Sequence, residues 1–148
     1  MSNSNGTHSP ADVIAAHLIA GGYATITSGV WPVYVNTIPS AVAGQAISIN
    51  DTGGVPPQPY FDGTIHEYPG IQIRVRGNPH DQTGPRTKIV EIRKHLSQIY
   101  RVSVSYDSAA YILHAMKSSS GIIPLPQDAQ ARWDWTTNFT VTVTQSSP

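Results

Sequence analysis

Alternation of apolar and polar residues makes the last part of the chain its clearest predicted strand. From Trp133 to Thr144 every second residue is Trp, Phe, Val or Thr on one side, and polar residues fill the positions between. At about 3.3 Å per residue such a strand spans about 40 Å. Strands usually have ~5–6 residues, so we expect its end to project from the sheet or to pair with another subunit. Residues 70–77 alternate in the same way, with Ile71, Ile73 and Val75 on one face.

Helical spacing and end signals predict two helices. Ser9 is suited to cap the first helix, Pro10 fits its first position, and Gly21-Gly22 ends it. The second helix is predicted to open at Pro85. Its apolar residues recur every third or fourth position, and we expect this stripe to hold the helix on a sheet: Ile89, Ile92, Leu96 and Ile99.

Shorter patterns complete the prediction. The segment 51–54 (Asp-Thr-Gly-Gly) is typical of a turn, and 55–69 contains four prolines, which predicts an irregular and functional loop. Two prolines in 121–127 predict an edge strand or a loop. Further strands are expected at 33–35, 47–49, 101–106 and 110–116.

The order of these elements predicts the α+β class. We expect a mostly antiparallel sheet with two helices packed on one face and a long C-terminal strand. Residues 1–8 are rich in Ser, Asn and Gly and are predicted to form a flexible N-terminal arm, while 9–148 are predicted to form a single domain.

Composition suits a protein that works by contact but does not by itself distinguish it from a soluble monomer. Only 12% of the residues are charged and the formal net charge is zero, so the attraction to nucleic acid or to an anionic membrane is weak. Such a surface suits burial against other protein, although a soluble monomer with a polar surface has the same composition. The absence of cysteine excludes disulfides, thiolate metal sites and cysteine nucleophiles. No apolar stretch approaches the ~20 residues of a membrane span.

No motif indicates catalysis, a cofactor or a metal. The six histidines are scattered, without the close spacing of a metal clip. The loop carboxylates have no feature that pairs any two of them, and no serine lies in a G-x-S-x-G elbow. Gly53-Gly54 lacks the Lys and Ser/Thr of a phosphate loop. We therefore expect no catalytic, cofactor-binding or metal-binding residues.

Interface residues are the more promising candidates. Arg74 and Arg76 lie on the polar side of a predicted strand, where they are either solvated and paired with carboxylates or part of an interface or channel lining. Trp133 and Trp135 suit a core, or an aromatic anchor at a subunit contact. The full set of candidate interface residues is Arg74, Arg76, Asp51, Tyr60, Phe61, Trp133 and Trp135.

Two runs stand out for their order and spacing: Asp-Thr-Gly-Gly at 51–54 and Pro-Gly-Ile-Gln-Ile-Arg-Val-Arg-Gly at 69–77. With several other segments, in the order in which they occur, they resemble the minor-capsid and tail-terminator proteins of long-tailed phages. The resemblance covers roughly residues 10 to 143. It also includes 33–35 with Pro39, 47–50, Pro56-Pro57, the helix at 89–96, Asp128, Arg132 and 138–141.

This resemblance implies a ring, commonly of six copies, that caps the finished tail tube and joins it to the head–tail connector. DNA would pass through the ring without sequence-specific binding, and the protein would assemble in the host cytoplasm into the virion neck. The alternatives are another neck or minor-capsid protein, and a β-rich virion adhesion module whose aromatic residues would be exposed to bind sugar. A small hydrolase has no motif in its favour.

Overall fold

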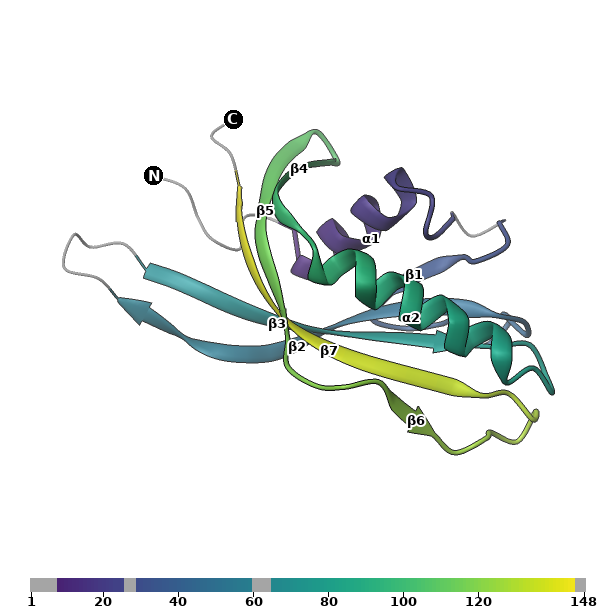
Figure 1. Ribbon diagram of the computed structural model, residues 1–148. Helices are drawn as coiled ribbons and strands as arrows, with labels where there is room; N and C mark the ends of the chain where they lie inside the picture. The colour runs from purple at the N-terminus through teal and green to yellow at the C-terminus, as the bar shows by residue number, and fades with distance from the viewer. Residues whose placement is uncertain (1–7, 26–28, 60–64, 146–148) are drawn as a thin grey trace.

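The computed structural model describes residues 8–25, 29–59 and 65–145, with the backbone alone given for 54–59 and 65–67. Two helices lie on the same side of one sheet (Figure 1). The helices are α1 (Pro10–Ala20) and α2 (Thr83–Ser97). The strands are β1 (Val33–Val35), β2 (Ala46–Pro59), β3 (Ile65–Arg76), β4 (Tyr100–Tyr106), β5 (Ala109–Ser118), β6 (Ile123–Leu125) and β7 (Asp134–Gln145).

The sheet has seven strands and is antiparallel except at one edge. Its order is β1-β2-β3-β7-β5-β4, and β6 pairs with β7 beside this path. The parallel pair is β1 with β2. The prediction of an α+β protein with a mostly antiparallel sheet, two helices on one face and a long C-terminal strand is confirmed.

The long strand β7 does not project. Residues 134–140 pair with β3, and residues 139–145 pair with β5. The expectation that its end projects is therefore wrong for the described residues, and pairing with another subunit stays a prediction. The physical reason is that the sheet curls, so that β7 has one set of neighbours in its first half and another in its second (Figure 1). Its length joins the two halves of the sheet.

The core lies between the helices and one face of the sheet. Ile71, Ile73 and Val75 of β3 have no exposed surface, and neither do Ile92 and Leu96 of α2. The apolar stripe of α2 and the alternation in β3 and β7 are thus confirmed as core patterns. Burial of this apolar surface is the main source of stability in such a domain.

The start of α1 is capped as expected, and at the start of α2 the residue before the N-cap accepts a first-turn N–H. The Ser9 Oγ accepts a hydrogen bond from the backbone N–H of Asp12, as the sequence predicts. Helix α2 begins at Thr83, two residues before the predicted start at Pro85, and the Asp81 carboxylate accepts from the Gly84 N–H at 2.9 Å. Proline is accommodated because first-turn N–H groups have no partner within a helix.

Candidate functional site

The strands β2 and β3 continue beyond the sheet as a two-stranded ribbon. β1 pairs with β2 only at 47–49, and β7 pairs with β3 only from Gly70 onward. Within the described residues, 52–59 and 65–69 therefore pair with each other and with no further strand. The ribbon (residues 52–59 and 65–69) extends well away from the helices (Figure 1). Its outer edges present backbone N–H and C=O groups that another chain could pair with.

The sequence predicted an irregular loop at 55–69 and a turn at 51–54, and both predictions are wrong for the described residues. These segments belong to β2 and β3. The register shifts between Thr52 and Val55 and again between Val55 and Gln58, so Pro56 and Pro57 fall where the ladder is interrupted. A ribbon tolerates proline at such irregularities and at outward positions, because no neighbouring strand requires its N–H.

The face of the sheet opposite the helices carries rows of polar side chains. The register places Asn50 beside Gln72 and Ser48 beside Arg74. A cavity of about 260 Å³ opens on this face, where residues 36–38 cover part of the sheet. Its lining residues are Asn36, Thr37, Ile38, Ser48, Asn50, Arg74 and Arg76.

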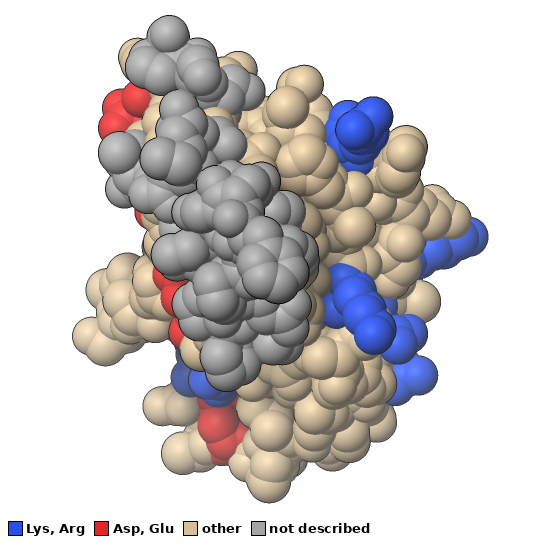
Figure 2. All heavy atoms as spheres, turned by 90° about the vertical axis from the view of Figure 1, so that its left-hand side faces the viewer, with Lys and Arg blue, Asp and Glu red and all other residues tan. Residues whose placement is uncertain are grey.

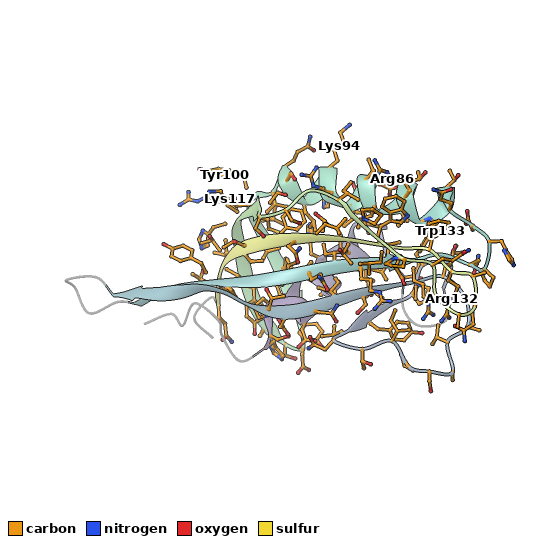
Figure 3. All side chains as sticks on the ribbon, turned by 90° about the horizontal axis from the view of Figure 1, so that it is seen from below. Arg86, Lys94, Tyr100, Lys117, Arg132 and Trp133 are labelled. Carbon is orange, nitrogen blue, oxygen red and sulfur yellow. The ribbon has the colours of Figure 1, made fainter. Side chains whose placement is uncertain are left out.

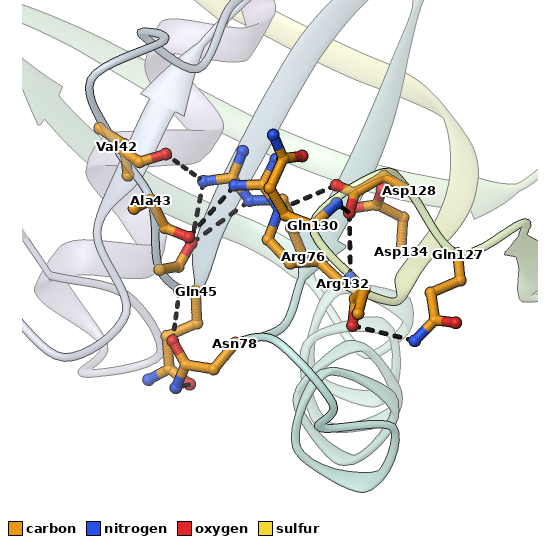
Figure 4. Close-up of polar contacts among 12 residues, drawn as sticks. Val42, Ala43, Gln45, Arg76, Asn78, Gln127, Asp128, Gln130, Arg132 and Asp134 are labelled. Atoms are coloured by element: carbon orange, nitrogen blue, oxygen red, sulfur yellow. Dashed lines mark hydrogen bonds and ion pairs between the residues drawn. The ribbon is translucent and has the colours of Figure 1, made fainter.

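The two arginines of this face are held by the molecule itself. Arg74 donates to the buried carboxylate of Asp134 at 2.8 Å, and this hydrogen bond is the main reason that the pKa of Arg74 is raised. Arg76 is buried and donates to the backbone carbonyl groups of Val42 and Gly44 at 2.9 and 2.8 Å (Figure 4). Burial, with the nearby charge of Arg132, lowers the pKa of Arg76. Of the two interpretations left open by the sequence, pairing with a carboxylate holds for Arg74.

A second ion pair closes the loop before β7. Arg132 donates to Asp128 through Nε at 2.8 Å and reaches the carbonyl of Ala43 at 3.1 Å (Figure 4). Burial acts to raise the pKa of Asp128, but hydrogen bonds from Arg132 and from the Gln130 N–H outweigh it and lower that pKa. The loop at 42–44 is thus fixed to β3 and to the start of β7.

The remaining predicted interface residues are dispersed. Asp51 accepts hydrogen bonds from the Ala11 N–H and from Asn36, so it joins α1, the end of β1 and β2. Trp135 is buried on the core face of β7, with the Arg86 guanidinium 4.8 Å from the ring centroid. Trp133 lies just before β7 and is half-buried. Tyr60 and Phe61 lie outside the described residues.

The predicted N-terminal arm is described only at its last residue. His8 donates its backbone N–H to the Tyr111 hydroxyl at 3.2 Å, and its Nε2 lies 3.1 Å from the Asp107 carboxylate. Residues 1–7 of the arm lie outside the described residues. The chain is therefore anchored to the β4–β5 hairpin at His8.

Sequence analysis missed a pair of histidines that joins the two helices. The Nε2 atoms of His17 in α1 and His95 in α2 lie 2.9 Å apart, and Tyr23 stacks on His95. One ring must donate and the other accept, so at least one of the two is neutral. Burial lowers both pKa values, and the nearby His95 lowers that of His17 further. The two residues are 78 positions apart, and no local pattern links them.

Throughout 8–25, 29–59 and 65–145, no three His, Asp or Glu side chains come together in a way that could hold a metal ion. In the same ranges no helix has the length and apolar character needed to cross a membrane.

Comparison with known proteins identifies the family. Residues 18–145 match the family model described as bacteriophage tail terminator protein, whereas a search of curated proteins finds no match. The matched range includes every strand of the sheet, the ribbon and α2. Because the match covers most of the chain, this protein belongs to the bacteriophage tail terminator family.

Proposed function

We propose that this chain acts as the tail terminator of a long-tailed phage, by forming a closed ring that caps the tail tube and joins it to the head–tail connector. The match to the tail terminator family over residues 18–145 carries the proposal. The coarser statement, that the protein is a structural component of the virion, follows from the family itself. The ring is most simply hexameric, as the sequence resemblance implies, and it assembles in the host cytoplasm.

The ribbon supplies a means of assembly. A two-stranded hairpin alone is marginally stable in water, and this one has free edges on both sides within the described residues. A subunit that stops the growth of a tube has to form a closed ring, because an open head-to-tail contact would extend into a filament. The ribbon is suited to reach the neighbouring subunit or the tail tube, and DNA would pass through the ring without sequence-specific contacts.

The adhesion-module alternative is weakened by the aromatic residues. Such a module needs exposed rings to stack on sugar, but Tyr111, Phe139 and Trp135 are buried. Among the described large hydrophobic residues that are exposed, Tyr100 is the aromatic one. The proposed function therefore rests on contact between proteins, without catalysis.

The test is an electron-microscope reconstruction of the phage neck, together with incubation of the purified protein with tail tubes. We expect density for this chain as a ring at the top of the tail, and tubes that stop growing after the protein is added. Density at another level of the neck would favour a neighbouring neck protein instead. Density at the fibre tips alone would favour the adhesion module.

A further inference from the structure

The polar cavity on the face opposite the helices is lined by two guanidinium groups. Arg74 and Arg76 are the charged residues among its described lining, which contains no Asp or Glu. A water molecule takes up about 30 Å³ in the liquid, so a cavity of about 260 Å³ has room for one small ion together with water. The lining therefore presents positive charge to a space of suitable size for an anion.

Arg76 is a buried cation that has no carboxylate partner in the part of the chain that the structure describes. Its side chain is 7% exposed, and Nε and Nη2 donate to the backbone carbonyl groups of Val42 and Gly44. Its Nη1 has no hydrogen-bond partner among the described residues. Carbonyl groups accept these hydrogen bonds but do not balance the charge, and a buried charge is costly unless an opposite charge accompanies it.

The charged groups around Arg76 leave one positive charge in excess. Arg74 is paired with Asp134, and Arg132 is paired with Asp128, so each of these two cations has its own carboxylate (Figure 4). All four groups lie near enough to act on the pKa of Arg76, and burial together with the charge of Arg132 lowers that pKa. Arg76 is thus the unbalanced cation of this group of five, and an anion in the cavity would balance it.

Other side chains of the cavity add hydrogen-bond donors. Asn50 accepts a hydrogen bond from the Ser48 hydroxyl through Oδ1 at 3.1 Å, so its Nδ2 remains as a donor without a partner in the described structure. Arg74 uses Nη2 for Asp134, and its side chain is 41% exposed, so the rest of its guanidinium group can bind a second acceptor. Carboxylate and phosphate oxygens are the acceptors that guanidinium groups bind most strongly.

We propose that this cavity binds one oxyanion, a carboxylate or phosphate group, held by Arg74 and Arg76 with Asn50 as a further donor. The oxyanion comes either as a free ion or on an acidic side chain of a second copy. The second source rests on the proposed ring function, whereas the site itself does not.

DNA is the less suitable source of the oxyanion, because a duplex is bound through several phosphates at once. The Lys and Arg atoms visible in Figure 2 lie mainly along one edge of the molecule. In Figure 3, Arg132 lies across the strands from Arg86 and Lys94 of α2. The cations of α2 therefore do not extend this site into a surface for a duplex.

Substitution of Asn50 tests the site and leaves both arginines in place. N50D puts a carboxylate into the cavity and keeps an oxygen that can accept from Ser48. It should bind inorganic phosphate roughly tenfold more weakly than the wild type, because like charges repel at short range. N50A removes the donor alone and should weaken binding less. S103D is the matched control: it adds the same charge at an exposed position of β4, the opposite edge strand of the sheet, and should bind phosphate like the wild type.

Binding is measured by nuclear magnetic resonance during titration with sodium phosphate, against sodium chloride at equal ionic strength to correct for general effects of salt. Backbone amide signals of 36–38, 48–50 and 74–76 should shift and saturate in the wild type and in S103D. Circular dichroism checks that each variant is folded. If the wild type shows no saturating shift, or if folded N50D and N50A both bind phosphate as tightly as the wild type, the inference is overturned. Tail capping by the wild type remains a separate test of the proposed function.

Assembly on tail tubes, observed by electron microscopy, distinguishes the sources. If a second copy supplies a carboxylate, added phosphate and the N50D substitution should each weaken ring formation, whereas S103D should not. If the oxyanion is a free ion, phosphate binds but ring formation by N50D is normal. Both results support the site. If a short double-stranded DNA shifts the same amide signals at a lower concentration than phosphate does, and N50D abolishes that shift, the cavity is a DNA contact and the inference is overturned.

Discussion

One pair of strands passes through two environments in this molecule. The first half of β2 and the second half of β3 lie in the sheet, where β1 and β7 flank them and the helices cover Ile47, Ile49, Ile71 and Ile73. Residues 52–59 and 65–69 of the same strands pair only with each other in the described structure. The sheet portion is held by burial, so it determines stability. The ribbon has no such support, and we infer that its shape is maintained for a partner.

The largest expected effect comes from the sheet side of this comparison. Leu96→Ala removes a fully buried side chain by which α2 packs on the sheet, and it should lower the free energy of unfolding by about 2–5 kcal/mol. Urea denaturation followed by circular dichroism measures this loss. Val90→Ala on the exposed side of the same helix is the matched control and should stay within ~0.5 kcal/mol. A loss below ~1 kcal/mol for Leu96→Ala would mean that the helix does not depend on this contact.

The position of Leu96 was accessible from the sequence because helical and strand periods are local. Ile89, Ile92 and Leu96 recur at the spacing of one helix face, and Ile71, Ile73 and Val75 recur at the spacing of one strand face. The ribbon could not be predicted from the sequence, because prolines argue against a strand only when that strand has a neighbour on each side. A strand with one neighbour can contain proline at positions whose N–H needs no partner.

The arginines show why charged sites are harder to predict. Arg74 and Arg86 both lie in amphipathic elements. Arg74 is paired with Asp134, whereas Arg86 has no carboxylate partner in the described structure. The difference arises because Asp134, 60 positions from Arg74 in the sequence, is brought beside it by a strand pairing that the sequence does not specify. The His17–His95 contact depends in the same way on how two helices are placed. Local patterns predicted the elements, but tertiary neighbours decide the state of each charge.

The next largest effect concerns the polar face beside the sheet half of β3. Asp134→Ala leaves the Arg74 guanidinium without its carboxylate, so the free energy of unfolding should fall by about 1–3 kcal/mol. The loss stays below that of a fully buried ion pair, because Arg74 is 41% exposed and water can reach it. The comparison variant is Asp107→Ala, whose carboxylate is 75% exposed beside His8 and should contribute little. Equal losses for the two would show that burial of Asp134 is immaterial.

A smaller effect is expected from pH at the helix pair. The pKa values of His17 and His95 are lowered in the folded protein, so the unfolded chain binds protons more tightly. The stability that the neutral pair provides is complete above the unfolded value of about 6.5 and is lost as the pH falls through the lower folded values. Unfolding measured from pH 7.5 to 5 should therefore show a decrease in the free energy of unfolding from this pair. The double variant H17Q/H95Q should show a smaller decrease in stability with falling pH, whereas H80Q should not. If the pH dependence of H17Q/H95Q equals that of the wild type, the histidine pair is not its cause.

The smallest expected effect on stability belongs to the ribbon, and it is paired with the largest effect on assembly. Deletion of residues 57–62 shortens strands that lack flanking partners and leaves the sheet pairs at 46–51 and 71–76 in place. The free energy of unfolding should therefore change by less than about 0.5 kcal/mol, since surface changes away from the core are nearly neutral. Rings should no longer form on tail tubes, because the proposed contact with the neighbour is gone.

A second variant, in which Gly and Ser replace 57–62 at equal length, tests whether the length of the ribbon or its sequence matters. This variant should stay folded but also assemble poorly, because a flexible segment must lose entropy on binding. Normal capping by the deletion variant would show that the ribbon is dispensable, and a loss of several kcal/mol would show that it belongs to the folding unit after all.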